Sequence, residues 1–333
     1  NKELKNFCIT NNIPIKSEGK LIVAKNEKDL EGLFSLYDNA KNNDIEVYLG
    51  RERELKDFEP NAKTFEYFLY VSSTFVVNPL DVLNVLYEYL KNKGVYFLLG
   101  CKFKKNIEKG LALIENKMIN YGFLINAGGL YADSIAHVFN VGLDYKILPF
   151  KGLYLIFNSD ERFIRRSIYP VPDLNFPFLG VHFTVGDHIK IGPTAILAFS
   201  RENYNMFYRF KFSEFKDIFL LALRLFFSKI KYRELFLREI SKYSKKRFYE
   251  DASALVKSIP NINKFKWYLS GIRAQLVNIK TMELENDFII QRGDCSLHIL
   301  NAVSPAFTAS FPFTKYIIEN YILTNKWLIK KDI

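Results

Sequence analysis

The fold class is decided by one stretch, Phe123-Leu-Ile-Asn-Ala-Gly-Gly-Leu-Tyr-Ala-Asp133. Its first residues have the apolar, β-branched character of a strand, and two glycines then lead into residues that favour a helix. A turn of this kind lets the backbone approach a ligand closely at the amino end of a helix. We therefore predict a ligand-facing turn at Gly128 and Gly129, with a plain strand-to-helix connection as the alternative.

Helices and strands alternate on both sides of this stretch. Before it, apolar spacing and end signals predict helices over 2–10, 27–42 and from Pro79 to Gly94. A strand is expected at 20–24 and an extended segment at 67–77. A small meander then follows, with runs at 96–99, 111–114, 117–121 and 123–125. A helix and a meander that return to a central strand indicate an α/β architecture.

The rest of the chain suggests two domains that exchange segments. A β-rich region covers 145–200, a basic and aromatic helical region covers 213–257, and strands return near 271–290. We expect 1–78 to supply mainly substrate-domain and connecting segments, and 79–144 the remaining part of a cofactor domain. The predicted substrate domain is 145–290 with its helical insertion, and 291–333 returns to the cofactor domain.

Composition narrows the class of protein. The 333 residues are 49% apolar and 25% charged, which suffices for a large core. The net charge of +11 favours an anionic ligand, but the same bias toward Lys, Asn, Ile, Phe and Tyr arises from genome composition alone. No recognised module or clustered basic motif indicates nucleic-acid binding.

The cysteines and apolar runs exclude several arrangements. The three cysteines are widely separated, so neither a disulfide framework nor a metal site is predicted, and a reducing compartment is expected. No apolar run reaches the roughly 18 residues of a spanning helix, and the sequence shows no signal-peptide pattern. The stretch 218–227, followed by four cations, is either a buried helix or a helix that lies on an anionic membrane.

Six further motifs follow along the chain. They are Leu148-Pro-Phe-Lys-Gly152, Ile168-Tyr-Pro-Val-Pro-Asp173, Phe178-Leu-Gly-Val-His-Phe-Thr184, Ile191-Gly-Pro193, Gly271-Ile-Arg-Ala-Gln275, and His298-Ile-Leu-Asn-Ala302 with Ser304-Pro-Ala306. In these motifs and their order the chain resembles, along nearly its whole length, the L-2-hydroxyglutarate oxidases and dehydrogenases of the FAD-dependent, D-amino-acid-oxidase-like superfamily.

The resemblance implies a glutathione-reductase-type FAD fold, interleaved with an antiparallel substrate domain. It also implies oxidation of L-2-hydroxyglutarate to 2-oxoglutarate by hydride transfer to flavin. Such a fold should open with Gly-x-Gly-x-x-Gly, whose amides hold the pyrophosphate, but no Gly-x-Gly occurs in this sequence. We expect that first βαβ unit to precede Asn1, and this chain without it to bind FAD weakly or not at all. The segment after Thr184 is also shorter than is usual in the family.

Three of the matching residues suit the chemistry of the substrate. Oxidation of a secondary alcohol needs a base for the hydroxyl proton, and His182 has a suitable pKa range, with a structural histidine as the alternative. His137 and His188 are weaker candidates. Two carboxylates require fixed cations, for which Arg273 is the first candidate and Lys151 the second, with surface ion pairs as the alternative.

A further set of residues is expected to bind the cofactor FAD. Donors in the closing stretch could face the flavin oxygen where negative charge collects on reduction, although Ser304 before Pro305 is equally typical of a helix cap. The predicted cofactor-binding residues are Gly128, Gly129, Asp133, Gly293, Asp294, Asn301, Ser304, Pro305 and Ala306.

Two other functions remain open. The flavin enzyme could act on another small hydroxy or amino acid or on glycerol 3-phosphate, or the chain could be a non-catalytic remnant. For the enzyme, the expected partners are a dicarboxylate or hydroxy-acid substrate, quinone or oxygen as electron acceptor, and a peripheral membrane surface, but no nucleic acid. The expected location is the cytoplasm or the periphery of an inner membrane, mitochondrial in a eukaryote.

Overall fold

The computed structural model describes residues 1–159, 161–172, 179–205, 208–302 and 305–323. Within these ranges the largest element is a sheet of ten strands. Neighbouring strands within this sheet run antiparallel, except for β11 and β2, which run parallel. In sheet order the strands are β16 (Glu283–Leu284), β15 (Phe265–Asn278), β10 (Tyr145–Phe157), β13 (Ile189–Gly192), β12 (Gly180–Phe183), β11 (Ser167–Pro170), β2 (Lys20–Val23), β4 (Tyr67–Val71) and β3 (Val47–Arg51), with β14 (Ile196–Leu197) paired to β10.

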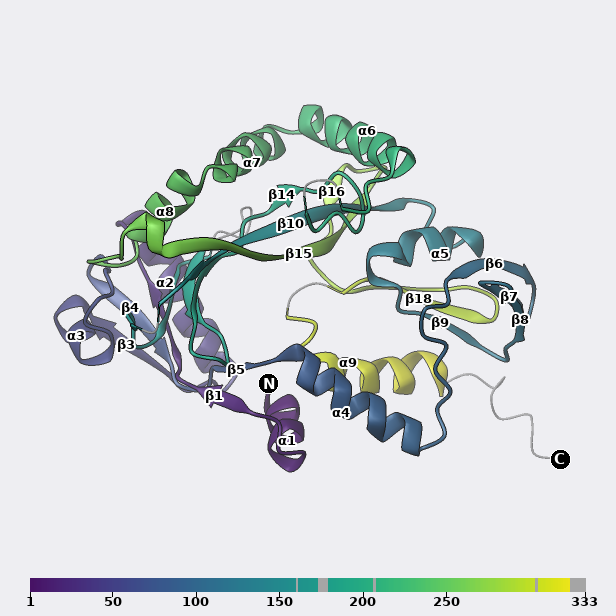
Figure 1. Ribbon diagram of the computed structural model, residues 1–333, viewed down its shortest axis with the longest axis horizontal. Coiled ribbons are helices and arrows are strands. Elements are labelled where there is room, and N and C mark those ends of the chain that lie inside the picture. Colours follow the sequence, from purple (N-terminus) through teal and green to yellow (C-terminus); the bar gives the residue numbers. More distant parts are fainter. Residues whose placement is uncertain (160, 173–178, 206–207, 303–304, 324–333) are drawn as a thin grey trace.

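Three consecutive helices cover one face of this sheet. They are α6 (Phe212–Ser228), α7 (Ile230–Ile240) and α8 (Lys245–Ser253), and they form an arc above β10 and β15 (Figure 1). Their apolar stripes are buried against the sheet, as amphipathic helices require. The α8 helix packs with Leu155 and Phe157, whereas α6 and α7 pack with Leu148 and Phe150.

A smaller sheet lies beside the first. It contains β17 (Ile289–Arg292), β18 (Ser296–Asn301) and β9 (Leu124–Asn126), and β18 and β9 run parallel. The helix α5 (Ala132–Val138) joins the two sheets, because Ala132 and Ala136 pack with Ile147, Leu276 and Leu300 in one core. The two sheets are therefore held in a fixed relation by α5.

The remaining elements lie around these sheets. The helix α2 packs on β3 and β4, while α1, α4 and α9 share a core and lie together in Figure 1. Their bounds are α1 (Lys2–Thr10), α2 (Lys28–Asn42), α3 (Leu55–Phe58), α4 (Pro79–Asn92) and α9 (Ser310–Ile317), with the paired strands β1 (Ile15–Ser17) and β5 (Phe75–Val77) and the meander β6 (Phe103–Glu108), β7 (Leu111–Ile114) and β8 (Lys117–Asn120).

The predicted α/β class is confirmed, as are the helices at 2–10, 27–42 and 79–94. The first turn of α4 has the predicted proline, and the Leu80 amide donates to the Asn78 side chain, which caps the helix. The strand expected at 96–99 is wrong. Tyr96 and Leu99 are 83% and 71% exposed, and in the described part of the chain no strand pairs with this run. The meander instead begins at β6.

The chain passes from the large sheet to the small one, returns to the large one, and then enters the small one again. Residues 20–71 and 145–284 supply the large sheet, whereas 124–126 and 289–301 supply the small one. Segments far apart in sequence therefore share each sheet. The domain boundaries at 78, 144 and 290 remain predictions.

The core around β10 yields a test of stability. Phe157 is 1% exposed, and its ring centroid lies 5.2 Å from those of Phe163 and Phe265. Phe157→Ala should lower the free energy of unfolding by about 3–5 kcal/mol in denaturant titrations, because the cavity cannot close fully. Phe227, which is 74% exposed, provides the matched control. Phe227→Ala should change stability by no more than about 0.5 kcal/mol, and an equal loss in both variants would contradict this description of the core.

Candidate active site

The first predicted residue, His182, lies on the face of the large sheet opposite α8. Side chains alternate along a strand, and Val181 and Phe183 on β12 belong to the core that α8 covers. His182 must therefore point to the other face. It is half-buried there, and Lys190 of β13 stands directly opposite it in the sheet register.

Aromatic rings surround the imidazole of His182. The Tyr169 ring stacks on it with centroids 5.8 Å apart, and the Tyr154 ring meets it edge-on at 6.1 Å. The Lys190 ammonium lies 5.7 Å from the Tyr154 ring centroid and 4.1 Å from that of Tyr268. These contacts place a histidine and a cation within one aromatic cluster.

This cluster keeps His182 uncharged near neutral pH. Desolvation by burial, assisted by the charge of Lys190, lowers the pKa of His182 to about 4, although a hydrogen bond to the Gly180 backbone opposes the shift. Its buried Nδ1 has no hydrogen-bond partner among the residues described. A neutral imidazole with an unpaired nitrogen can accept a proton, which a general base must do.

Lys151 and Arg273 lie on the neighbouring strands β10 and β15. Lys151 is 5% exposed, and its Nζ donates to Asn203 Oδ1 at 3.0 Å. Burial lowers its pKa, and no carboxylate pairs with it in the described ranges. Arg273 is exposed, and its charge lowers the pKa of Tyr154 while burial of that tyrosine raises it. In the sheet register Arg273 stands opposite Phe150, whose side chain packs beneath α6 and α7, so Arg273 belongs to that face of the ladder.

A second group lies at the carboxyl ends of β9 and β18. The two strands are parallel, so the turn after Asn126 and the end of β18 at Asn301 share one edge of the small sheet. Gly129 has φ +53°, and a Cβ placed on it would meet nothing within 4 Å. Ligands of parallel sheets bind at this edge.

Asn301 leaves a buried acceptor at that edge. Its Nδ2 donates to the Glu285 and Asp287 carbonyls at 3.2 and 2.6 Å, and the residue is 1% exposed. Its Oδ1 has no partner in the part of the chain that the structure describes. Because a buried polar atom is costly without a hydrogen bond, Asn301 is able to receive a donor from a bound group.

Asp133 is fully engaged by protein groups. Its Oδ1 accepts from Arg201 Nη1 and the Ser134 amide, both at 2.7 Å, and its Oδ2 accepts from Arg201 Nη2 and the Ile147 amide at 2.9 Å. Burial alone would raise the pKa of Asp133, but Arg201 and the two amides together hold it below the usual range. The carboxylate ties α5 to β10 and to the loop after β14, and its predicted cofactor role remains untested.

The other predicted cofactor residues are spread along the chain. Gly293 and Asp294 occupy the turn before β18, about 17 Å from Asn301 at 3.4 Å per strand residue. Asp294 pairs with Lys109 at 2.9 Å. Pro305 and Ala306 follow Asn301 and lead toward α9, whereas Ser304 lies outside the described residues, as do Asp173 and Phe178 of the quoted motifs. The structure thus separates Gly293 and Asp294 from the edge that holds Gly129 and Asn301.

Several residues of these groups escaped the sequence interpretation. Tyr154, Tyr169 and Lys190 lie far apart in sequence, and only the sheet register brings them to His182. The Arg201 partner of Asp133 is 68 residues away. The alternation of β12 and β13 was the available signal, since it places Lys190 opposite His182 once the hairpin is recognised.

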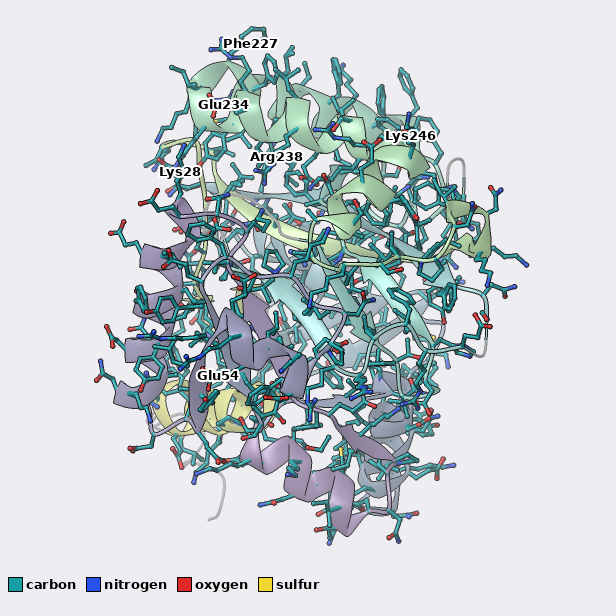
Figure 2. The ribbon with its side chains drawn as sticks, turned by 90° about the vertical axis from the view of Figure 1, so that its left-hand side faces the viewer. Lys28, Glu54, Phe227, Glu234, Arg238 and Lys246 are labelled. Atoms are coloured by element: carbon teal, nitrogen blue, oxygen red, sulfur yellow. The ribbon has the colours of Figure 1, made fainter. Side chains whose placement is uncertain are left out.

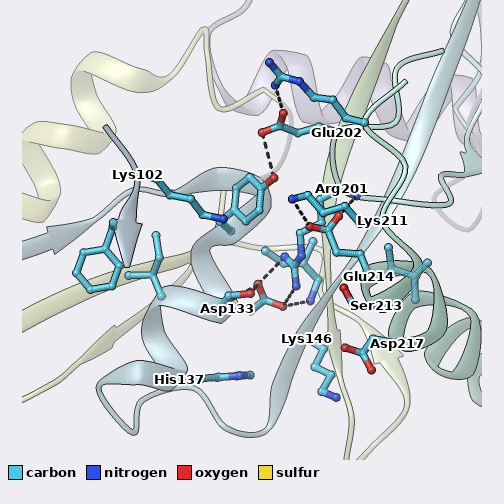
Figure 3. Close-up of a pocket in the computed structure, with 18 of the residues that line it drawn as sticks. Lys102, Asp133, His137, Lys146, Arg201, Glu202, Lys211, Ser213, Glu214 and Asp217 are labelled. Carbon is cyan, nitrogen blue, oxygen red and sulfur yellow. Dashed lines mark hydrogen bonds and ion pairs between the residues drawn. The ribbon is translucent and has the colours of Figure 1, made fainter. Parts of the chain in front are cut away.

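A cavity of about 1230 Å³ lies apart from His182, between α5, the segment 100–104 and the start of α6. Figure 3 shows the Asp133–Arg201 pair inside it, with Lys146 and Asp217 on its wall. Of the residues predicted for the site, Gly128 and Asp133 line this cavity, whereas His182, Lys151 and Arg273 do not.

Comparison with known proteins identifies the family of this chain. The family described as FAD dependent oxidoreductase matches residues 1–319, and the chain belongs to this family. It is 33% identical to the L-2-hydroxyglutarate dehydrogenase of Indibacter alkaliphilus, over 99% of this chain and 82% of that protein. It is 28% identical to the mitochondrial L-2-hydroxyglutarate dehydrogenase of Mus musculus, over 94% of this chain and 72% of that protein. The resemblance found in the sequence is thereby confirmed.

Solved structures confirm the predicted fold. The L-alpha-glycerophosphate oxidase of Mycoplasma pneumoniae, reduced and with FAD bound, has a TM-score of 0.69 at 18% identity, over 92% of this chain and 73% of that one. The glycine oxidase of Bacillus cereus has a TM-score of 0.62 at 12% identity, over 96% of this chain and 78% of that one. At such identities these likenesses concern the fold alone.

FAD is the cofactor of this family, and the described residues fit one end of it. The buried acceptor of Asn301 and the open backbone at Gly129 suit the polar edge of a flavin. The pyrophosphate end lacks its usual anchor in this sequence, since Gly-x-Gly is absent. Gly128 serves packing, because a Cβ there would lie 2.7 Å from Ile135 and 3.0 Å from Asn126.

The Asp133–Arg201 pair should be a major source of stability. Asp133→Asn leaves a largely buried guanidinium without its charge partner, so we expect a loss of about 3–5 kcal/mol in the free energy of unfolding. Because its folded pKa is lowered, the contribution is complete above the ordinary aspartate range and disappears as the pH falls. The exposed Asp144–Lys280 pair gives the control. Asp144→Asn should cost no more than about 1 kcal/mol, and equal losses would refute a special role for Asp133.

Buried His298 should make stability depend on pH. Its Nδ1 lies 3.1 Å from Asn126 Nδ2 and its Nε2 lies 2.9 Å from Ser296 Oγ, and burial lowers its pKa from 6.5 to about 4. Between these pH values the unfolded chain binds a proton that the folded chain does not, so stability should fall as the pH drops from 6.5 to 4.

Denaturant titrations at several pH values test this dependence. His298→Gln should reduce the slope of stability against pH, and His182 should supply the part that remains, because its pKa is lowered similarly. His188→Gln, at an exposed turn, should leave the slope unchanged. An unaltered slope in His298→Gln would contradict the prediction.

Proposed function

We propose that this chain catalyses the FAD-dependent oxidation of L-2-hydroxyglutarate to 2-oxoglutarate. The observation that carries the proposal is the neutral imidazole of His182, in a chain that is similar along its length to proteins named L-2-hydroxyglutarate dehydrogenase. The imidazole supports the type of reaction, and the likeness supports the substrate.

His182 acts as the general base of the proposed reaction. Oxidation of the alcohol removes a hydride from C2 and a proton from the hydroxyl oxygen, and bound FAD supplies the hydride acceptor. The free Nδ1 of His182 takes the hydroxyl proton. With a pKa of about 4, the imidazole is uncharged across the physiological range, as a base must be before it accepts a proton.

Lys151 and Arg273 bind the two carboxylates of the substrate. The Lys151 ammonium contacts the neutral acceptor Asn203, so its charge is not balanced by that contact. The planar guanidinium of Arg273 can bind a carboxylate through two parallel hydrogen bonds. In this proposal each cation binds one carboxylate of the substrate.

The edge formed by β9 and β18 holds the flavin in this proposal. Gly128 and Gly129 supply backbone, and Asn301 supplies its free acceptor. Pro305 and Ala306 supply the segment that leads to α9, and Ser304, which lies outside the described residues, remains a predicted cofactor residue. Asp133, Gly293 and Asp294 remain candidates for cofactor binding, although Asp133 and Asp294 already form ion pairs.

Electrons leave the reduced flavin for a quinone or for oxygen in this proposal. A quinone acceptor would require contact with a membrane, which places the chain at the periphery of an inner membrane, whereas oxygen as acceptor is compatible with the cytoplasm. The names of two relatives support a mitochondrial location for a eukaryotic protein.

The visible spectrum of the chain mixed with FAD tests the proposal. Anaerobic addition of L-2-hydroxyglutarate should bleach the flavin. His182→Gln should slow this step by about a hundred- to ten-thousand-fold, while His188→Gln retains the rate. In the wild type the rate should fall only near pH 4, where His182 becomes protonated. Lys151→Met should raise KM, because the ammonium contacts a substrate carboxylate.

Other outcomes distinguish the alternatives. Bleaching by an amino acid or by glycerol 3-phosphate, without a response to L-2-hydroxyglutarate, would assign a different substrate, which the fold shared with the glycerophosphate oxidase permits. A full-length gene product that binds no flavin would support a non-catalytic function.

A further inference from the structure

The helix α6 has two apolar faces, and the sheet covers one of them. The inner face packs against β10 through Ile218, Leu221, Ala222 and Leu225. A second apolar stripe follows the opposite side at steps of three, four or seven residues. Its members are exposed by 41–74%: Phe212, Phe219, Leu220, Leu223 and Phe227. A buried helix accounts for the inner face but not for this second stripe.

The stripe continues onto α7. Ile230 and Leu237 are 65% and 59% exposed, on the side of α7 opposite its buried Tyr232, Leu235 and Phe236. Together with the α6 stripe they form what we call the outer face. Figure 2 shows Phe227 at the extreme end of this layer, pointing away from the sheet. An exposed apolar surface of this size marks an interaction site.

The charges around the outer face are predominantly positive. Residues 211–251 contain eleven cations and six carboxylates, a net charge of +5. Some cations are used internally, since Lys229 and Lys231 pair with Glu283 and Lys242 pairs with Glu239. Five exposed cations have no partner within the described ranges of the chain: Lys216, Arg224, Arg233, Lys246 and Arg247.

These cations lie where they can meet the same partner as the apolar residues. On α6, Lys216 is four residues after Phe212 and three before Phe219, so it lies within the stripe, and Arg224 flanks it. On α7, Arg233 lies on the outward side between Ile230 and Leu237. An apolar stripe with interspersed and flanking cations is typical of helices that lie in the interface of an anionic membrane.

We propose that the outer face of α6 and α7 docks on a lipid bilayer that contains anionic phospholipid. The apolar side chains enter the acyl boundary, and Lys216, Arg224 and Arg233 contact lipid headgroups. In the described residues no helix has both the length and the apolar character needed to cross a bilayer, which agrees with surface binding.

A second copy of the chain fits this surface less well. A two-fold interface brings the same patch of both copies together. Lys216, Arg224 and Arg233 would then approach the same three cations of the other copy. On this side of α7 the carboxylate that could offset their charge is Glu234. Repulsion between the cations opposes such a dimer, while anionic headgroups neutralise them.

Vesicle sedimentation tests the proposal without reference to catalysis. The wild-type chain should sediment with vesicles of phosphatidylcholine and phosphatidylglycerol at least about tenfold more strongly than with phosphatidylcholine alone. Phe219→Ser/Leu223→Ser/Phe227→Ser should reduce this binding by about tenfold or more, because three apolar anchors are lost. Lys216→Gln/Arg224→Gln/Arg233→Gln should abolish the preference for anionic vesicles.

The control replaces equally exposed apolar residues elsewhere. Leu80→Ser/Leu99→Ser/Met118→Ser changes residues that are 61–71% exposed and should leave binding unchanged. Circular dichroism checks that every variant is folded. The proposal fails if the wild type does not sediment with anionic vesicles, if the control and the outer-face variant bind equally, or if the outer face instead holds a dimer that Phe219→Ser/Leu223→Ser/Phe227→Ser converts to a monomer. None of these results depends on whether L-2-hydroxyglutarate is the substrate.

Discussion

The long antiparallel ladder between β10 and β15 is the constraint on which the rest of the structure depends. It runs from Tyr145 opposite Asn278 to Phe157 opposite Phe265. Its side chains enter three separate cores, beneath α8, beneath α6 and α7, and against α5. Because one pair of strands contributes to all three, any change in its register would misplace each core at once.

The ladder also positions the chemistry. Lys151 and Arg273 are carried by its two strands, and Tyr154 of β10 contacts His182 on the third strand away from β15. The small sheet is fixed to the ladder by α5 and by the Asp133 contact with the Ile147 amide. The proposed base, the cations proposed to bind the substrate carboxylates and the proposed flavin edge are therefore parts of one packed framework, as preorganised sites require.

The helical layer above the ladder has two roles in this interpretation. Its inner residues complete a core, while its outer residues remain apolar although water surrounds them. Exposed phenylalanine and leucine do not stabilise the isolated fold, so their presence at helical spacing calls for a partner. The same helix can thus support the site from one side and meet a surface with the other.

Local signals in the sequence determined the helices at 2–10, 27–42 and 79–94, the glycine turn after β9, and the flavoenzyme resemblance. Capping residues, a first-turn proline and apolar spacing act within a few residues, so they can be recognised in the sequence without knowledge of the tertiary structure. The strand predicted at 96–99 was wrong because β propensity does not show whether another strand is available to pair with the run. Only tertiary structure decided that Tyr154, Tyr169 and Lys190 surround His182, that Arg201 binds Asp133, and that one apolar face of α6 stays uncovered. These facts depend on strand register and packing between distant segments, which local sequence does not encode.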